Sequence, residues 1–245
     1  MVKRLFALLI ALAVSFSASA DQTNIRAFVD ASCAAEARDY AVNSKALFAE
    51  WYPKINEILF GADHPLPQHE ILVVLEPDLQ FPAFATGSQV HADCGYIKQM
   101  PDGYPAMMIH ELVHIVQSYP AKPAETRWIV EGIADYVRHK YYEKDISPTL
   151  RIDHEGRLYG YGDREPYFQS LQTNRVDLSS KGYLQSYTVA SSFLFWLETK
   201  KDKQIVRELN LAFSQGQYSP ELFQKHCGKP LDDLWAEFVA YSKAH

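Results

Sequence analysis

The stretch HELVH, residues 110–114, sets two histidines four positions apart, with a glutamate directly after the first. Apolar residues precede the motif and separate the histidines, and the proline-rich stretch YPAKPAE (119–125) follows it. This pattern predicts a helix over residues 103–118. Residues four apart on a helix lie one turn apart on the same face, so the imidazoles of His110 and His114 can point at one metal ion.

Two histidines are too few for a catalytic zinc ion, which keeps three protein ligands and one open position. A second helix is predicted over ETRWIVEGIADYVRHKYY (125–142), and the short loop before it favours antiparallel packing on the first. Glu131 of this helix has apolar neighbours, so we expect it near a buried face, where a carboxylate needs a partner. The sequence therefore predicts one zinc ion per chain, held by His110, His114 and Glu131.

Two further carboxylates have predicted roles at this site. Glu111 would lie to the side of the metal position, where it could take a proton from a water molecule on the metal without being a ligand. Asp135 follows Glu131 by one helical turn, and a histidine that binds zinc normally gives its other N–H to a carboxylate or carbonyl. We therefore expect Asp135 to orient His110. His139, beyond this segment, is expected at the surface.

The other predicted elements make this an α+β chain. Helices are expected over about 31–59, 186–199, 203–214 and 230–243, a strand over HEILVVLEPD (69–78), two short strands within PAFATGSQVHADCGYI (82–97), and an irregular excursion over 145–182. A strand-containing N-terminal lobe would extend to about residue 118, and a helical C-terminal lobe would follow it. Together they would form a single catalytic domain, residues 21–245.

The first twenty residues have the layout of a secretory signal peptide. A basic start is followed by an apolar stretch, Leu5 to Phe16, and by Ala18-Ser19-Ala20. The alternative is a membrane anchor, but the apolar stretch is short of the roughly 20 residues that span a bilayer. We expect cleavage after Ala20, a secreted or periplasmic protein, and no stable membrane association afterwards.

Composition narrows the possible partners. The 245 residues carry a net charge of −6 and no basic block beyond the leader, so no nucleic-acid partner is expected. The three cysteines are Cys33, Cys94 and Cys227. Export permits a disulfide, and an odd count leaves at least one thiol over. All three pairings stay open.

Several segments resemble the basic secretory protein family of plants and bacteria, which is assigned to the gluzincin type of peptidase. They are HELVHIVQSY (110–119), WIVEGIADYVR (128–138), SYTVASSFLFWLE (186–198), IVRELNLAF (205–213) and GKPLDDLWAEF (228–238). The resemblance implies a thermolysin-like zincin core, one zinc ion and peptide-bond hydrolysis. It implies the zinc ligands His110, His114 and Glu131 and the general base Glu111. The acidic charge of this chain departs from the family's name.

Peptide hydrolysis also needs a donor for the oxyanion that forms on the substrate. Tyr187 is our candidate, because Ser186 is a plausible N-cap and Tyr187 would open the next helix. In the family pattern a tyrosine stands at this place. Tyr183 and His154 are weaker alternatives.

An extended substrate can add to an exposed sheet edge. We expect SQVHADCGYI (88–97) to be that edge, with Gly95 allowing close backbone approach. His91 could line the cleft, although a histidine in a strand is more often structural.

The favoured function is a secreted zinc peptidase that acts on peptides or proteins. No group that would hold a free amine is identified, which favours an endopeptidase over an aminopeptidase. The alternatives are an exported binding protein with a structural or vestigial zinc site, and a zinc amidase that acts on a cell-wall amide. An intact Glu111 argues against a purely structural site. The sequence leaves open the cleavage preference, the oligomeric state and any calcium site.

Overall fold

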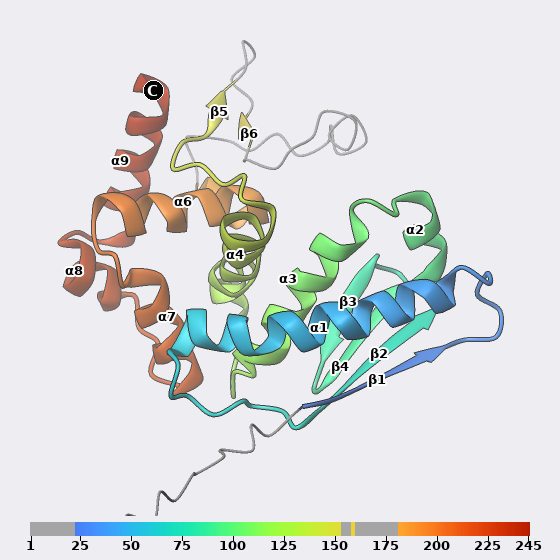
Figure 1. The fold of residues 1–245 in the computed structure, drawn as a ribbon. Coiled ribbons are helices and arrows are strands. Elements are labelled where there is room, and N and C mark those ends of the chain that lie inside the picture. The colour runs from blue at the N-terminus through green and yellow to red at the C-terminus, as the bar shows by residue number, and fades with distance from the viewer. Residues whose placement is uncertain (1–22, 153–157, 160–180) are drawn as a thin grey trace, which may run out of the picture.

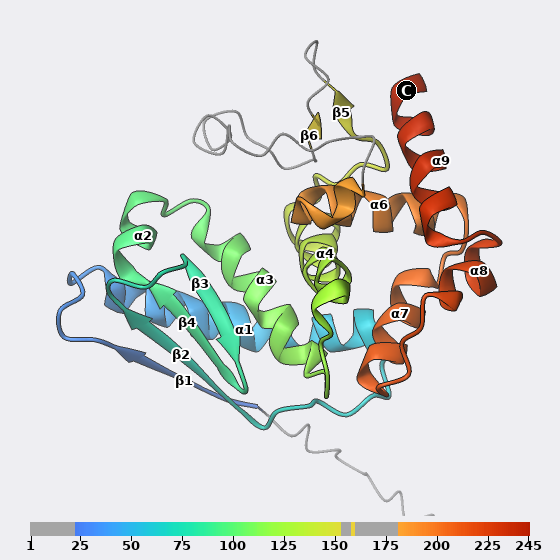
Figure 2. The same ribbon diagram turned by 180° about the vertical axis from the view of Figure 1, so that it is seen from behind.

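Residues 23–152, 158–159 and 181–245 are described by the computed structural model of the protein, which Figures 1 and 2 show from opposite sides. Four strands form a mixed sheet in the order β1-β2-β4-β3. They are β1 (Asn24–Val29), β2 (Glu70–Glu76), β3 (Ala83–Thr86) and β4 (Gln89–Asp93). β2 is parallel to both β1 and β4, whereas β3 and β4 form an antiparallel hairpin. Among the described strands, the edges of the sheet are therefore β1 and β3.

Helices cover one face of this sheet, and the opposite face is turned toward the viewer in Figure 2. Helix α1 (Ala37–Phe60) connects β1 to β2, and α3 (Tyr104–Gln117) packs beside it. In β2, Ile71, Val73 and Leu75 alternate along the strand and are fully buried. Their burial follows from the period of two in a strand, which sends every second side chain to the covered face.

The strand predictions are largely confirmed. The strand expected over 69–78 is β2, and the pair expected within 82–97 is the β3–β4 hairpin, which turns at Gly87 with a φ of 56°. The expected edge SQVHADCGYI (88–97) is wrong, because β4 lies between β2 and β3. Its last residues form α2 (Cys94–Gln99) instead of a strand, since the Asp93 side chain caps that helix. Gly95 therefore lies in a helix.

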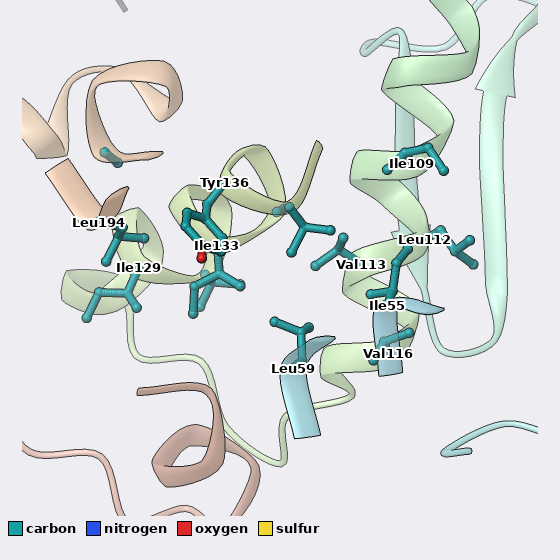
Figure 3. Close-up of a cluster of buried hydrophobic side chains, with 14 of the residues drawn as sticks. Ile55, Leu59, Ile109, Leu112, Val113, Val116, Ile129, Ile133, Tyr136 and Leu194 are labelled. Carbon is teal, nitrogen blue, oxygen red and sulfur yellow. The ribbon is translucent and has the colours of Figure 1, made fainter. Parts of the chain in front are cut away.

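The two predicted helices at the centre of the chain are confirmed. They are α3 and α4 (Arg127–Val137), and α4 is preceded by a 3-10 turn (Ala124–Thr126) and continues in a π-helical turn (Arg138–Glu143). Figure 3 shows apolar side chains that pack α3 and α4 against α1 and against α6 (Tyr187–Lys200). The labelled residues are Ile55, Leu59, Ile109, Leu112, Val113, Val116, Ile129, Ile133, Tyr136 and Leu194.

The C-terminal part of the chain is helical, as predicted. Its helices are α6 (Tyr187–Lys200), α7 (Ile205–Ser214), α8 (Glu221–Cys227) and α9 (Leu231–Ala244). α8 has no counterpart among the predicted elements. Aromatic rings fill the space between α4, α6 and α9: Phe193 lies 5.2 Å from Phe238 and 6.1 Å from Trp128, measured between ring centroids. The buried apolar cluster is continuous from α1 to α9.

Gly132 allows α4 and α6 to approach each other closely. A Cβ added at Gly132 would lie 3.0 Å from the Cβ of Ala190 and 3.2 Å from Cδ1 of Leu194. Separations of that size are shorter than ordinary van der Waals contact between carbon atoms. A glycine next to Glu131 therefore sets how near α6 comes to the helix that carries this residue.

Cys33 and Cys94 form a disulfide, and Cys227 is free. The bond joins the turn before α1 to the first residue of α2. It closes a loop that contains α1 and the three strands β2, β3 and β4. The pairing that the sequence left open is thereby resolved.

The fold class is α+β with a small mixed sheet, as predicted. The predicted signal peptide lies outside the described residues, as does most of the excursion expected over 145–182. Within that excursion, β5 (Arg151–Ile152) and β6 (Leu158–Tyr159) form an antiparallel pair. None of the helices in the described part of the chain combines the length and the apolar character needed to cross a membrane.

Candidate metal centre

The two histidines of HELVH project from α3 toward α4 and nearly meet. The Nε2 atoms of His110 and His114 lie 3.2 Å apart. His110 is 8% exposed, and His114 is partly buried. Their position follows from the local helix geometry, because residues four apart lie on one face. The predicted pairing of these two imidazoles is therefore present.

Glu131 completes a triangle of potential metal ligands from α4. Its Oε2 lies 3.2 Å from Nε2 of His110 and 3.3 Å from Nε2 of His114. Ligands bound at about 2.0–2.1 Å to a tetrahedral ion lie about 3.3 Å from one another. The three edges therefore fit one face of a tetrahedron around a single ion, and the donor set of two imidazoles and one carboxylate is one that metals accept.

The other ring nitrogen of each histidine has a partner that fixes the ring. Nδ1 of His110 lies 2.7 Å from Oδ1 of Asp135, as expected from the sequence. Nδ1 of His114 lies 2.8 Å from Oε1 of Gln117, whose amide donates to the carbonyl of Val130. Both Nε2 atoms are thus left to face Glu131. Gln117 was not predicted, although its place three residues after His114 on the helix puts it within reach.

Charge at the triangle is balanced by a proton when no cation is bound. Burial alone would lower the pKa of His110, but the Asp135 and Glu131 carboxylates raise it to about 10. Burial alone would raise the pKa of Glu131, but hydrogen bonds to the two histidines hold it well below its usual range. The site therefore attracts positive charge, and a divalent ion that binds there must displace the proton from His110.

Glu111 lies beside the triangle without belonging to it. Its side chain is buried, at 7% exposure. Its charge raises the pKa of the His110 ring, which places the carboxylate within electrostatic reach of that ring. Among the described residues it has no hydrogen-bond or ion-pair partner. Glu111 is thus a buried carboxylate next to the metal position whose oxygens are free to accept a proton.

Tyr187, at the first position of α6, lies near His110. The centroids of the two rings are 6.2 Å apart and the rings are nearly parallel. Burial and the nearby Glu131 carboxylate raise the pKa of the Tyr187 hydroxyl, so it remains protonated at neutral pH. Arg127 donates a hydrogen bond to this hydroxyl at 2.7 Å. The predicted donor is therefore adjacent to the metal position, and Arg127 is a neighbour that the sequence reasoning missed.

The weaker candidates lie elsewhere. Tyr183 is 2% exposed and packs 4.4 Å from Trp128, so its ring belongs to the aromatic core. His154 lies outside the described residues. His91 pairs with Glu76 at 2.6 Å on the sheet and stacks on Phe84.

The prediction that His139 lies at the surface is wrong, since the residue is 3% exposed. α4 continues into the π-helical turn, which packs against α3. Nδ1 of His139 lies 3.0 Å from Asp145 and 3.1 Å from Glu143, and Arg138 donates to Glu143 at 2.7 Å. His139, Glu143 and Asp145 are close enough together to hold a metal ion as well, but the Arg138 guanidinium already supplies positive charge beside them.

Residues 169–238 match the model of a family described as peptidase of plants and bacteria (BSP). The described part of this segment includes α6, α7 and α8 and therefore Tyr187, whereas HELVH and Glu131 precede it. The predicted resemblance to the basic secretory protein family is confirmed by this match. No curated protein and no solved structure matches the chain significantly.

Proposed function

From this match and the geometry of the metal centre, we propose that the protein is a secreted zinc metallopeptidase with a thermolysin-like catalytic core. The observation that carries the proposal is the triangle of His110, His114 and Glu131, with buried Glu111 beside it. Two imidazoles and a carboxylate are a donor set used by zinc peptidases. A purely structural site needs no unpartnered carboxylate at its side. A peptide or protein is the proposed substrate.

Zinc in this triangle would supply a Lewis acid and lower the pKa of water at its open position toward about 7. Glu111 would accept a proton from the attacking water and pass it to the leaving amine. Its burial keeps competing water away from the carboxylate. Asp135 and Gln117 would hold the two imidazoles in the tautomers that present Nε2, while the Tyr187 hydroxyl would donate to the oxyanion on the substrate.

The edge strand β3 is the proposed binding place for the substrate backbone. It pairs only with β4, so its other side is free among the described strands, and α3 packs against it. An extended peptide can add to such an edge through main-chain hydrogen bonds. This assignment replaces the edge that the sequence predicted, which lies inside the sheet.

Export is part of the proposal. The N-terminal pattern of residues 1–20 favours a cleavable signal peptide. The Cys33–Cys94 disulfide is a feature of proteins that mature in an oxidising compartment. Mass spectrometry of the exported protein tests this point: a mature N-terminus at Asp21 is expected, and retention of residues 1–20 would contradict it.

Glu111→Gln is the decisive variant for the activity, because it removes the base and keeps the size of the side chain. Wild type and variant are loaded with zinc and incubated with a mixed peptide library, and the products are identified by mass spectrometry. We expect cleavage by the wild type, a rate about 10²–10⁴-fold lower for the variant, and equal zinc content. Glu57→Gln, at an exposed position of α1, is the matched control and should cleave like the wild type.

Equal cleavage by wild type and Glu111→Gln would show that this base is not used. Absence of cleavage by either would contradict the peptidase proposal. Cell-wall fragments assayed in parallel separate peptide-bond hydrolysis from hydrolysis of a wall amide.

A further inference from the structure

Arg127 contacts two groups of the metal centre at once. It is the first residue of α4 and lies one turn before Glu131. Its Nε is 3.6 Å from Oε1 of Glu131, the carboxylate oxygen that does not face the histidines. One terminal nitrogen donates to the Tyr187 hydroxyl at 2.7 Å. The same guanidinium thus bridges α4 to the start of α6.

Stability of the helix does not account for this arginine. A positive charge in the first turn opposes the helix dipole and is unfavourable. The Arg127 side chain is 69% exposed, and exposed ion pairs contribute little to stability. Helix stability therefore gives no reason for an arginine here, and its position is better explained by the groups that its guanidinium contacts.

The contact determines where the hydroxyl proton of Tyr187 can go. An arginine only donates, so the Tyr187 oxygen must be the acceptor in this hydrogen bond. The hydroxyl proton then points away from Arg127 and has no acceptor among the residues that the structure describes. A hydroxyl that accepts from a cation is also a stronger donor, because hydrogen bonds in a chain polarise one another.

We propose that Arg127 is a positioning residue for the peptidase reaction: it holds the Tyr187 hydroxyl so that its proton is directed at the oxyanion of the substrate. The inference rests on the proposed function and goes beyond it, since it assigns Arg127 an effect that operates through Tyr187. A merely structural arginine would affect activity whether or not the hydroxyl is present. An arginine that acts through Glu131 would change zinc binding.

A double-mutant cycle separates these possibilities. The proteins are wild type, Arg127→Gln, Tyr187→Phe and the double variant, each loaded with zinc. The measurements are zinc content, kcat and KM on a cleaved peptide, and the Kd of a peptide in which a phosphonate replaces the cleaved bond. Lys54→Gln is the matched control, because Lys54 forms an exposed i,i+4 pair with Glu50 on α1, outside the metal centre.

We expect Tyr187→Phe to lower kcat by about 10²-fold, the effect of removing one oxyanion donor. Arg127→Gln should lower kcat about 10-fold with KM changed less than about threefold, which marks a transition-state contact. In the Tyr187→Phe background the same substitution should have no further effect on kcat or on phosphonate affinity. Arg127→Lys should recover part of the loss, because lysine keeps a donor but not the planar fork. Zinc content should be unchanged in every variant.

An equal effect of Arg127→Gln in both backgrounds would overturn the inference and leave the peptidase proposal intact. Loss of zinc in proportion to loss of activity would also overturn it, since Arg127 would then act on Glu131. If the wild type cleaves no peptide, the proposed function fails by itself. The phosphonate Kd then decides the inference, and equal affinity of wild type and Arg127→Gln, or no binding by either, overturns it.

Discussion

Oδ1 of Asp135 lies 2.7 Å from Nδ1 of His110, and both side chains are buried. The contact crosses from α4 to α3, so the packing of these two helices orients the histidine ring. It also leaves Nε2 of His110 facing Glu131, which is on the same helix as Asp135. One turn of α4 therefore supplies both a potential metal ligand and the group that orients a second one.

Asp135→Asn should weaken zinc binding by about 10–100-fold, because the neutral amide no longer balances charge on the ligating imidazole. Competition with a chromophoric chelator measures the affinity. Asp202→Asn is the control. Asp202 lies in the turn between α6 and α7, 2.9 Å from Nδ1 of His226 on α8, and has no contact with the metal centre. Equal zinc affinity of Asp135→Asn and wild type would show that this contact is dispensable.

Stability should depend on pH through His139. Burial acts to lower its pKa, but hydrogen bonds to Asp145 and Glu143 raise it to about 9. Because the folded pKa exceeds the unfolded value of about 6.5, the protonated ring stabilises the fold fully below pH 6.5. That contribution is lost as pH rises through about 9.

Urea unfolding of chelator-treated wild type and His139→Gln at pH 6 and pH 10 measures this effect. The wild-type advantage should be about 1–3 kcal/mol larger at pH 6. An advantage that is the same at both values would contradict a protonated His139.

Removal of the disulfide by Cys33→Ser/Cys94→Ser should lower the free energy of unfolding by about 4 kcal/mol, given the 61-residue separation. The bond restricts the unfolded chain, and a long loop loses more freedom when it is closed. Cys227→Ser is the control, because Cys227 forms no disulfide. Urea denaturation compares the variants, and a double variant as stable as the control would disprove the expected contribution.

Gly132→Ala should destabilise the protein by about 1–3 kcal/mol, because crowding against Ala190 outweighs the better helix propensity of alanine. Ala190→Gly should cost less in the Gly132→Ala background than in the wild type, since it restores the missing space. Thermal unfolding of the four proteins in this cycle gives the coupling. Additive effects would mean that the two helices separate freely at this position.

Much of the metal centre could be predicted because its geometry is local. HELVH fixes His110, Glu111 and His114 on one helix, and Glu131 and Asp135 share a face of the next. To bring the two helices together, the prediction needed only their antiparallel packing, which the short loop between them favours. Arg127 was missed because its contact with Tyr187 bridges 60 residues of sequence and needs α6 in place.

The errors in the fold also have physical causes. β1 was not among the predicted strands, because the hydropathy of its residues alternates only weakly. Its more buried face carries the small Ala27 between Ile25 and Val29, and the apolar Phe28 is exposed on the other face. Its pairing with β2 depends on the α1 crossover, which no local pattern reveals. His139 was placed at the surface because it follows a charged residue, whereas the π-helical turn rotates it into contact with Glu143 and Asp145.

The free edge of the sheet is short, since β3 has only four residues. Alternate residues of an edge strand turn their backbone groups outward, so about two residues of a bound peptide could pair with β3. Main-chain hydrogen bonds over so short a strand would contact little of the peptide and would not distinguish one side chain from another. If the proposed substrates bind there, β3 would pair with only a short stretch of polypeptide, and discrimination among sequences would have to come from side-chain contacts near the metal centre.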